Sequence, residues 1–302
     1  MTMDQRETDE HFELHLTARA NDSTITELIA GSSKLSKRQI KQCLYNGSVW
    51  LEDRSGIRRI RRAKKILKDG DSIHLYYDRN IQQQDCPAAE LVADLGDYSV
   101  WNKPCGMYSQ GSRWGDHCTI YRYAETHLQP QRPAFIVHRL DRATNGLMLL
   151  AHSKSMANTL SRMFEQRRIE KHYRATVTGH IDQEELPIHI DRDIDGKRAV
   201  SDIIDIESST TDSTRLVIRI ETGRKHQVRR HLAEIGHPIL GDRLYGTGGG
   251  MGNDRADIDL QLQCCLLRFT CPVEQVTRTY QLDHLPENEP KTASAHGSNI
   301  KR

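Results

Sequence analysis

Apolar residues recur at helical spacing in three segments of the chain. Each of these segments begins or ends at a residue that favours a helix terminus. Serines 36 and 153 suit N-terminal caps, and glycines 47 and 236 suit C-terminal ends. We therefore predict three helices, which start after Ser36, after Ser153 and near residue 226. Their apolar faces comprise Ile40, Cys43 and Leu44; Met156, Leu160, Met163 and Phe164; and Val228, Leu232 and Ile235.

Other segments have the pattern of strands. A turn signal at residues 69–71 precedes an alternating stretch with Ile73, Leu75 and Tyr77. The run GLMLLA at 146–151 is continuously apolar, which is typical of a strand buried on both faces. Further strands are expected at 48–51 and within HYRATVTGHI and TRLVIRIE. Because helices and strands do not alternate strictly, the predicted fold class is α+β.

Composition divides the chain into five segments. We expect an acidic tail, a small basic domain, a polar linker, a large domain and a disordered polar tail. The expected boundaries are 1–22, 23–78, 79–95, 96–285 and 286–302. The glycine-rich segment 246–255 lacks the pattern of a phosphate-binding loop, so it is interpreted as a flexible loop.

The small formal net charge of +2 conceals a local excess of basic residues. Residues 1–22 carry two arginines against six acidic residues, whereas residues 23–78 carry twelve basic against six acidic residues. Residues 79–302 balance at 29 against 29. A clustered basic surface is what neutralisation of RNA phosphates requires, although an ordinary solvated basic face would have the same composition.

Cysteines and histidines give no pattern of a metal centre. The seven cysteines are scattered without a C-x-x-C pair, and none of the fifteen histidines falls in H-E-x-x-H. We therefore expect reduced thiols and no metal. The acidic start lacks the order of a secretory signal, and no apolar run is long enough for a membrane helix. These observations favour a soluble cytoplasmic protein.

Charged and ionisable side chains are frequent in two segments of the chain, and such groups are costly to bury beside apolar residues. Asp141 lies just before the predicted buried strand, among His138, Arg139 and Arg142. The second segment, 221–246, carries Arg229 among further basic residues. A carboxylate at the mouth of a buried strand stays ionised only when a cation or several hydrogen bonds compensate its desolvation. A structural Asp–Arg pair would also satisfy this requirement.

Both segments match one known family. HRLDRATNGL resembles the H-R-L-D signature of the RluA-type RNA pseudouridine synthases, and TGRKHQVRRHLAEIGHPILGDRLYG resembles a second block of that family. EKHYRATVTG and WNKPCG are similar to two further motifs, in the family's order. Asn145 stands where the family usually has serine. The resemblance implies a catalytic domain with a mixed, mainly antiparallel sheet flanked by helices. The basic segment 23–78 resembles the alpha-L RNA-binding domain of a small-subunit ribosomal protein, which implies that a small RNA-binding domain precedes the catalytic domain.

The resemblance implies roles for individual residues. Asp141 matches the catalytic aspartate, which attacks the anomeric carbon or removes a ribose proton. Tyr173 matches the tyrosine that stacks on the target uracil, and Arg229 matches the basic residue paired with the aspartate. Arg139 matches the side chain that enters the space of a flipped-out nucleotide. The other residues expected to bind substrate or order its site are His138, Thr144, Arg224, His226 and His231.

These roles agree with the chemistry of base exchange. An ionised carboxylate can trap or stabilise an electron-deficient sugar without metal or cofactor, and an arginine beside it stays positively charged. A base inside a helix must be extruded, which favours an aromatic wall and a side chain to occupy the gap. We therefore expect an RNA uridine isomerase that uses no cofactor.

The expected partner is structured RNA, with ribosomal RNA favoured and transfer RNA as the alternative. We expect a monomer that does not bind membranes. In the basic domain the predicted RNA contacts are Lys37, Arg38, Lys41, Arg58, Arg59, Arg61 and Arg62. A non-catalytic RNA-binding or ribosome-assembly factor that retains the fold, and a nucleoside glycosidase, are the competing interpretations.

Overall fold

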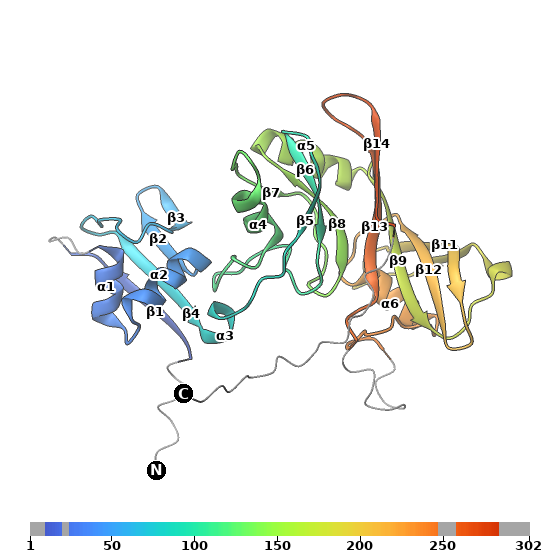
Figure 1. The fold of residues 1–302 in the computed structure, drawn as a ribbon, viewed down its shortest axis with the longest axis horizontal. Coiled ribbons are helices and arrows are strands. Elements are labelled where there is room, and N and C mark those ends of the chain that lie inside the picture. Colours follow the sequence, from blue (N-terminus) through green and yellow to red (C-terminus); the bar gives the residue numbers. More distant parts are fainter. Residues whose placement is uncertain (1–9, 20–23, 247–257, 284–302) are drawn as a thin grey trace, which may run out of the picture. The chain divides into compact units, whose positions relative to one another are not determined.

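The chain folds into two compact units (Figure 1). The N-terminal unit contains Met1–Ala89 together with Gly106–Arg139, and the catalytic-motif unit contains Glu90–Cys105 together with Leu140–Arg302. The computed structural model describes residues 10–19, 24–246 and 258–283. None of the helices within these ranges is long and apolar enough to cross a bilayer.

The N-terminal unit contains a four-stranded antiparallel sheet in the order β1-β4-β2-β3. Alternate residues of β4 are buried, as the sequence predicts, and they pack with the apolar faces of α1 and α2 in one core. The elements of this unit are β1 (His11–Thr17), α1 (Ile25–Ser32), α2 (Lys37–Asn46), β2 (Val49–Asp53), β3 (Gly56–Arg59), β4 (Ser72–Asp78), α3 (Arg79–Gln82), α4 (Ile120–His127) and β7 (Phe135–Ile136).

Helix α2 begins and ends where its sequence predicts. The Ser36 side chain accepts a hydrogen bond from the backbone of Gln39, and the Gln39 side chain accepts one from the backbone of Ser36. At the other end Gly47 adopts φ +77°. Its N–H donates hydrogen bonds to the carbonyls of Cys43 and Leu44 in the last turn. The buried face is Ile40, Cys43 and Leu44, which confirms the predicted helix.

The catalytic-motif unit is built on one large sheet in the order β10-β11-β12-β9-β13-β8-β6-β5, with β14 paired to β13. These strands pair antiparallel except β8 and β13, which are parallel. The predicted α+β class is therefore confirmed. Its elements are β5 (Glu90–Asp94), β6 (Tyr98–Lys103), β8 (Asn145–Ala151), α5 (Lys154–Glu165), β9 (Glu170–Thr178), a 3-10 turn η2 (Gln183–Glu185), β10 (Ile188–Asp191), β11 (Val200–Ser209), β12 (Ser213–Ile220), α6 (Gln227–Glu234), β13 (Leu262–Thr270) and β14 (Thr277–Gln281).

Strand β8 is the centre of this unit, and all of its residues are buried, as predicted. It starts with a close approach to β13, where Gly146 is the register partner of Cys264. Gly146 adopts φ +115, and a Cβ at this position would lie 2.3 Å from the Cys264 carbonyl oxygen. Only glycine allows the two backbones to approach this closely.

The other two predicted helices are also confirmed. Ser153 caps α5 by accepting a hydrogen bond from the backbone of Met156. Helix α6 buries Val228 and Leu232, and Gly236 follows it with φ +87. Ile235 lies just past the end of α6 and is half-buried.

Two strands lie in segments from which none was expected. Residues 11–17, in the expected acidic tail, form β1, and residues 90–94, in the expected linker, form β5. Strand β1 pairs with β4 and strand β5 pairs with β6, and these neighbours supply the backbone partners that the composition of the two segments does not reveal. The expected domain boundaries stay predictions. Most of the glycine-rich segment and the whole C-terminal tail lie outside the described residues.

The expectation that all cysteines are reduced is wrong for two of them. Cys86 and Cys118 form a disulfide within the N-terminal unit, although 32 positions separate them in the sequence. The other five cysteines are thiols. The cytoplasmic location, which rested partly on reduced thiols, stays a prediction.

Candidate active site

Asp141 lies in the turn that leads into β8. Its backbone carbonyl accepts a hydrogen bond from Thr144 N at 3.1 Å, and the Thr144 side chain is buried. The Asp141 side chain stays 34% exposed, so a large substrate can reach it. The next residue after Thr144 is Asn145, whose side-chain oxygen is buried without a hydrogen-bond partner in the described part of the protein.

Helix α6 brings two basic side chains to the Asp141 carboxylate. Arg229 Nη1 lies 3.9 Å from Asp141 Oδ2, and His226 Nε2 lies 3.8 Å from Asp141 Oδ1. Both distances exceed a hydrogen bond, so these contacts are electrostatic. The carboxylate therefore faces the positive charge of Arg229 and the ring of His226, and neither group engages it in a hydrogen bond.

Asp242 is the residue that fixes Arg229. Its buried carboxylate accepts Arg229 Nε and Nη2, both at 2.7 Å, and also the backbone N–H groups of Leu244 and Tyr245. Burial acts to raise the pKa of Asp242, but these hydrogen bonds outweigh it and lower the pKa below its ordinary value. The family resemblance pairs Arg229 with Asp141. In the structure Arg229 has a much closer partner, Asp242.

Tyr245 and His226 complete the surroundings of Arg229. The Tyr245 hydroxyl lies 2.9 Å from His226 Nδ1, and the Tyr245 ring centroid lies 5.1 Å from the Arg229 guanidinium carbon. His226 starts α6 with φ +55, and burial lowers its pKa, while the Asp141 carboxylate opposes that shift. His226 thus connects Asp141 to Tyr245.

Tyr173 lies on β9, where it is the register partner of Cys264 on β13. Its side chain is buried. Burial raises the pKa of its hydroxyl well above the ordinary value, and Cys264 and Asp141 raise it further. The hydroxyl therefore stays protonated at neutral pH.

Lys103 is a site residue to which the sequence assigned no role. It ends β6 and is completely buried, and its Nζ donates hydrogen bonds to the carbonyls of Pro104 at 3.1 Å and Arg142 at 3.4 Å. Burial lowers the pKa of Lys103 to about 8, and the nearby Asp141 carboxylate resists that shift. Lys103 therefore joins the end of β6 to the turn that carries Asp141.

The remaining predicted side chains have other surroundings. Arg224 is exposed and donates from Nε to the Arg198 carbonyl at 3.0 Å. His231 is buried and contacts Ser201 Oγ at 2.9 Å, which joins α6 to β11. Arg139 belongs to the N-terminal unit, where it donates to Gln110 Oε1 at 3.3 Å, and His138 belongs to the same unit.

Comparison with known proteins finds one family that this chain resembles. The family described as RNA pseudouridylate synthase matches residues 97–234. The dual-specificity RNA pseudouridine synthase RluA of Haemophilus influenzae is 34% identical over 176 residues, which are 53% of this chain and 78% of that protein. The tRNA pseudouridine synthase C of Haemophilus ducreyi is 32% identical over 210 residues, which are 60% of this chain and 86% of that protein.

This chain belongs to the RNA pseudouridine synthase family. It is therefore an isomerase that acts on uridines in RNA, as its motifs predict. The fold agrees, because human RNA pseudouridylate synthase domain containing 4 superposes with a TM-score of 0.53 at 24% identity, covering 65% of this chain and 88% of that one. The matched span includes Lys103, Asp141, Tyr173 and Arg229 and ends before Asp242.

The basic residues of this synthase's N-terminal unit fall into two groups. Lys37, Arg38 and Lys41 on α2 are exposed, and so is Arg62. The other predicted RNA contacts are engaged within the unit. They are Arg58, which pairs with Asp53; Arg59, which bonds the Gly47 carbonyl; and Arg61, which pairs with Asp116.

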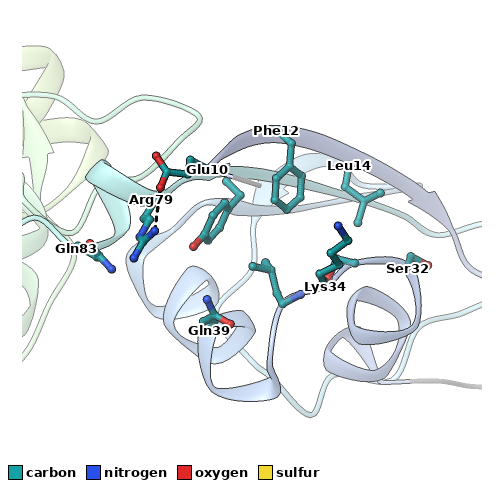
Figure 2. A pocket seen from close by; sticks show the side chains of 11 residues that line it. Glu10, Phe12, Leu14, Ser32, Lys34, Gln39, Arg79 and Gln83 are labelled. Carbon is teal, nitrogen blue, oxygen red and sulfur yellow. Dashed lines mark hydrogen bonds and ion pairs between the residues drawn. The ribbon is translucent and has the colours of Figure 1, made fainter. Parts of the chain in front are cut away.

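The N-terminal unit of this synthase also contains a pocket of about 620 Å³ (Figure 2). Phe12, Leu14 and Tyr77 give it an apolar wall, and an Arg79–Glu10 ion pair of 2.8 Å lies at its edge. None of the site residues expected from the sequence lines it.

Proposed function

We propose that this synthase converts specific uridines of ribosomal RNA to pseudouridine, with Asp141 as the catalytic carboxylate. The observation that carries the proposal is the position of Asp141. Its carboxylate is partly exposed at the entrance to β8 and faces Arg229 at 3.9 Å and His226 at 3.8 Å. A reactive carboxylate needs such access together with compensating positive charge.

The reaction exchanges one bond to the sugar for another. The C1′–N1 glycosidic bond breaks, the C1′–C5 bond forms, and the proton that leaves C5 is balanced by a proton gained at N1. Asp141 acts either as the nucleophile at C1′ or as the base that removes a ribose proton. Both routes need an ionised carboxylate, and neither needs a metal or cofactor.

Tyr173 holds the extruded uracil by stacking. Its hydroxyl stays protonated because burial raises its pKa, which disfavours a tyrosinate base and favours a neutral phenol that stacks and donates a hydrogen bond. Arg139 enters the space that the flipped nucleotide leaves. Thr144 supports the Asp141 turn, and Arg224 contacts phosphate.

The N-terminal unit supplies RNA affinity. Lys37, Arg38, Lys41 and Arg62 are exposed and basic, which suits contacts to phosphates. Arg58, Arg59 and Arg61 have internal partners, so in this proposal they shape the surface instead. The likeness of this unit to the alpha-L RNA-binding domain favours ribosomal RNA. The name of the Haemophilus ducreyi relative favours transfer RNA, which is the alternative substrate.

The experiment is a map of pseudouridine at each position of total RNA from cells that lack the gene. The cells are complemented with the intact protein, with Asp141→Asn or with Tyr173→Phe. We expect one or a few positions of ribosomal RNA to lose the mark, and only the intact protein and, more slowly, Tyr173→Phe to restore it. Loss confined to transfer RNA would replace the proposed substrate.

The alternative hypothesis is that the protein acts as an RNA-binding factor that retains the fold of the family. It predicts that Asp141→Asn complements every phenotype of the deletion as well as the intact protein does. Asparagine keeps the size of the side chain and removes its charge, so the variant separates reaction from binding. Full complementation would make catalysis dispensable in that cell, and an unchanged pseudouridine map would contradict the proposed reaction.

A further inference from the structure

Three metal-binding side chains meet in the N-terminal unit. Cys86 Sγ, Cys118 Sγ and a ring nitrogen of His117 all lie within 4.8 Å of one another. Cys86 follows α3, and His117 and Cys118 precede α4. In the structure the two cysteines are joined as a disulfide.

The ring of His117 has an unmet requirement. Both of its nitrogens are buried, and although the backbone groups of Gln84 and Asn46 lie near the ring, no group in the described part of the chain makes a hydrogen bond of ordinary geometry with either nitrogen. A buried polar atom without a partner destabilises the folded state. A cation held between this ring and the two sulfurs would satisfy one of the nitrogens.

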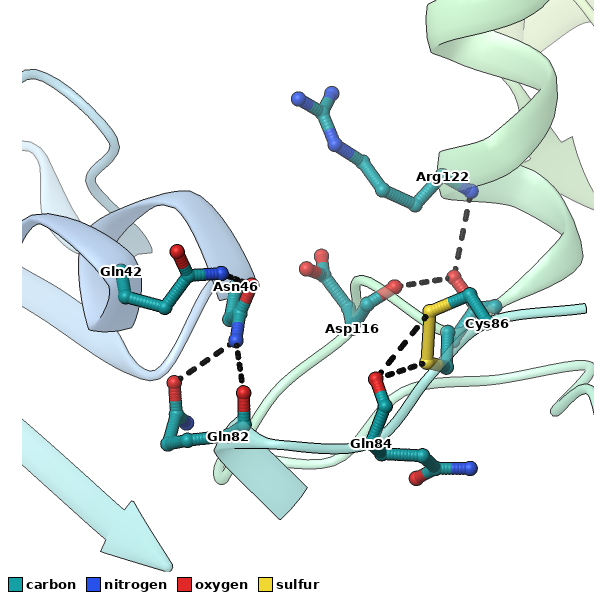
Figure 3. The surroundings of a disulfide bond; sticks show 9 residues. Gln42, Asn46, Gln82, Gln84, Cys86, Asp116 and Arg122 are labelled. Carbon is teal, nitrogen blue, oxygen red and sulfur yellow. Dashed lines mark hydrogen bonds between the residues drawn. A yellow bond between two sulfur atoms is a disulfide. The ribbon is translucent and has the colours of Figure 1, made fainter. Parts of the chain in front are cut away.

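The surrounding backbone is fixed independently of the sulfurs (Figure 3). Asn46 at the end of α2 donates to the backbone oxygen of Gln82 at 3.1 Å, and Asp116 N donates to the Asn46 carbonyl at 2.9 Å. Arg61 donates two hydrogen bonds of 2.6 Å to the Asp116 carboxylate. Both ligand-bearing segments are therefore held against α2, so the ligands stay close together when the disulfide opens.

We propose that Cys86, His117 and Cys118 bind Zn²⁺ when the disulfide is reduced. A dithiol reductant supplies two electrons and two protons, which convert the S–S bond into two thiols. Zn²⁺ then binds the two thiolates, and both protons are released. Two thiolates and one imidazole form a donor set that Zn²⁺ accepts in tetrahedral geometry.

Water completes the coordination shell. The Asp116 carboxylate is occupied by Arg61, and Cys86 is exposed to solvent, so three protein ligands leave one open position. An oxidant that reforms the disulfide expels the metal. One cross-link thus joins these segments of the N-terminal unit in both the oxidised and the reduced, metal-bound state. The proposed site is independent of the isomerase reaction.

The test uses the full-length protein, stripped of metal by a chelator and reduced with a phosphine under inert gas. Co²⁺ is added first, because its thiolate complexes absorb strongly, and Zn²⁺ then displaces it against a chromogenic chelator. We expect a thiolate-to-cobalt band at one equivalent, its loss on adding Zn²⁺, and no band for the oxidised protein.

Matched variants assign the ligands. His117→Gln should weaken Zn²⁺ binding by at least about tenfold, and Cys86→Ser or Cys118→Ser should reduce the thiolate band. His127→Gln and Cys105→Ser should bind like the wild type. The proposal is wrong if the reduced wild type gives no thiolate band, a result that needs no variant to fold, or if His117→Gln binds Zn²⁺ as tightly as the wild type.

Discussion

The guanidinium of Arg229 donates two hydrogen bonds of 2.7 Å to the buried carboxylate of Asp242. This bidentate pair leaves Arg229 Nη1 directed toward Asp141 at 3.9 Å. Asp242 is therefore a positioning residue in the proposed mechanism, because it sets where the positive charge lies relative to the reacting carboxylate.

Asp242→Asn tests this arrangement. Asparagine keeps the shape but cannot accept the guanidinium with a full charge, so we expect Arg229 to shift and turnover per folded molecule to fall by about 100-fold. RNA affinity should change little. The measurement is single-turnover pseudouridine formation together with RNA binding by filter retention, on protein whose folded fraction is known from circular dichroism.

The control for Asp242→Asn is Asp195→Asn. Asp195 pairs with Arg230, the next residue of α6, at 2.9 Å, but its side chain is 68% exposed. Exposed pairs contribute about 0–1 kcal/mol, so this variant should keep wild-type turnover. Equal losses in both variants would mean that the effect of Asp242→Asn does not arise from the position of Arg229.

Lys103 should give the protein an unusual dependence of stability on pH. Its pKa falls from 10.5 in the unfolded chain to about 8 in the fold, so between these values the unfolded state binds more protons. The contribution of Lys103 to the free energy of unfolding therefore rises with pH from about 8 to about 10.5, by about 3 kcal/mol.

Lys103→Met isolates this effect. Methionine fills the same space without a charge, and any difference in packing is independent of pH. We expect the stability of the wild type relative to the variant, from urea unfolding at several pH values, to increase as pH is raised above 8. A difference that stays constant from pH 7 to 10 would contradict the lowered pKa of Lys103.

Gly146→Ala should destabilise the catalytic-motif unit. The new Cβ would lie 2.3 Å from the Cys264 carbonyl oxygen and 2.6 Å from its nitrogen, which are backbone atoms that cannot move aside alone. Together with φ +115, this should lower the free energy of unfolding by at least about 2 kcal/mol. Thermal unfolding followed by circular dichroism measures the loss.

Gly196→Ala is the control for the backbone conformation alone. Gly196 adopts φ +70, but a Cβ there meets no atom within 4 Å. Gly196→Ala should lower the free energy of unfolding by about 1 kcal/mol, because only the cost of the left-handed backbone conformation remains. If both alanine variants lose the same free energy of unfolding, the close approach of β8 and β13 does not contribute to the loss in Gly146→Ala.

The local sequence determined three of the helices, α2, α5 and α6, and the buried strand β8; α1, α3 and α4 were not predicted from it. Both ends of α2 are defined by hydrogen bonds within a few residues, made by Ser36, Gln39 and Gly47. Their effect can therefore be predicted without knowledge of the fold. The same holds for the Ser153 cap of α5 and the apolar run of β8. The motif around Asp141 likewise pointed to the family that the comparisons show.

Tertiary structure decided which side chains meet. Asp242 and Arg229 pair because the chain returns after α6, and Cys86 meets His117 and Cys118 because hydrogen bonds fasten two distant segments to α2. Strands β1 and β5 form because β4 and β6 offer them backbone partners. Apart from the pairing of β5 with β6, which are neighbours along the chain, these contacts join residues that are separated in sequence. Their energy arises only when the fold brings those residues together, so no local pattern could reveal them.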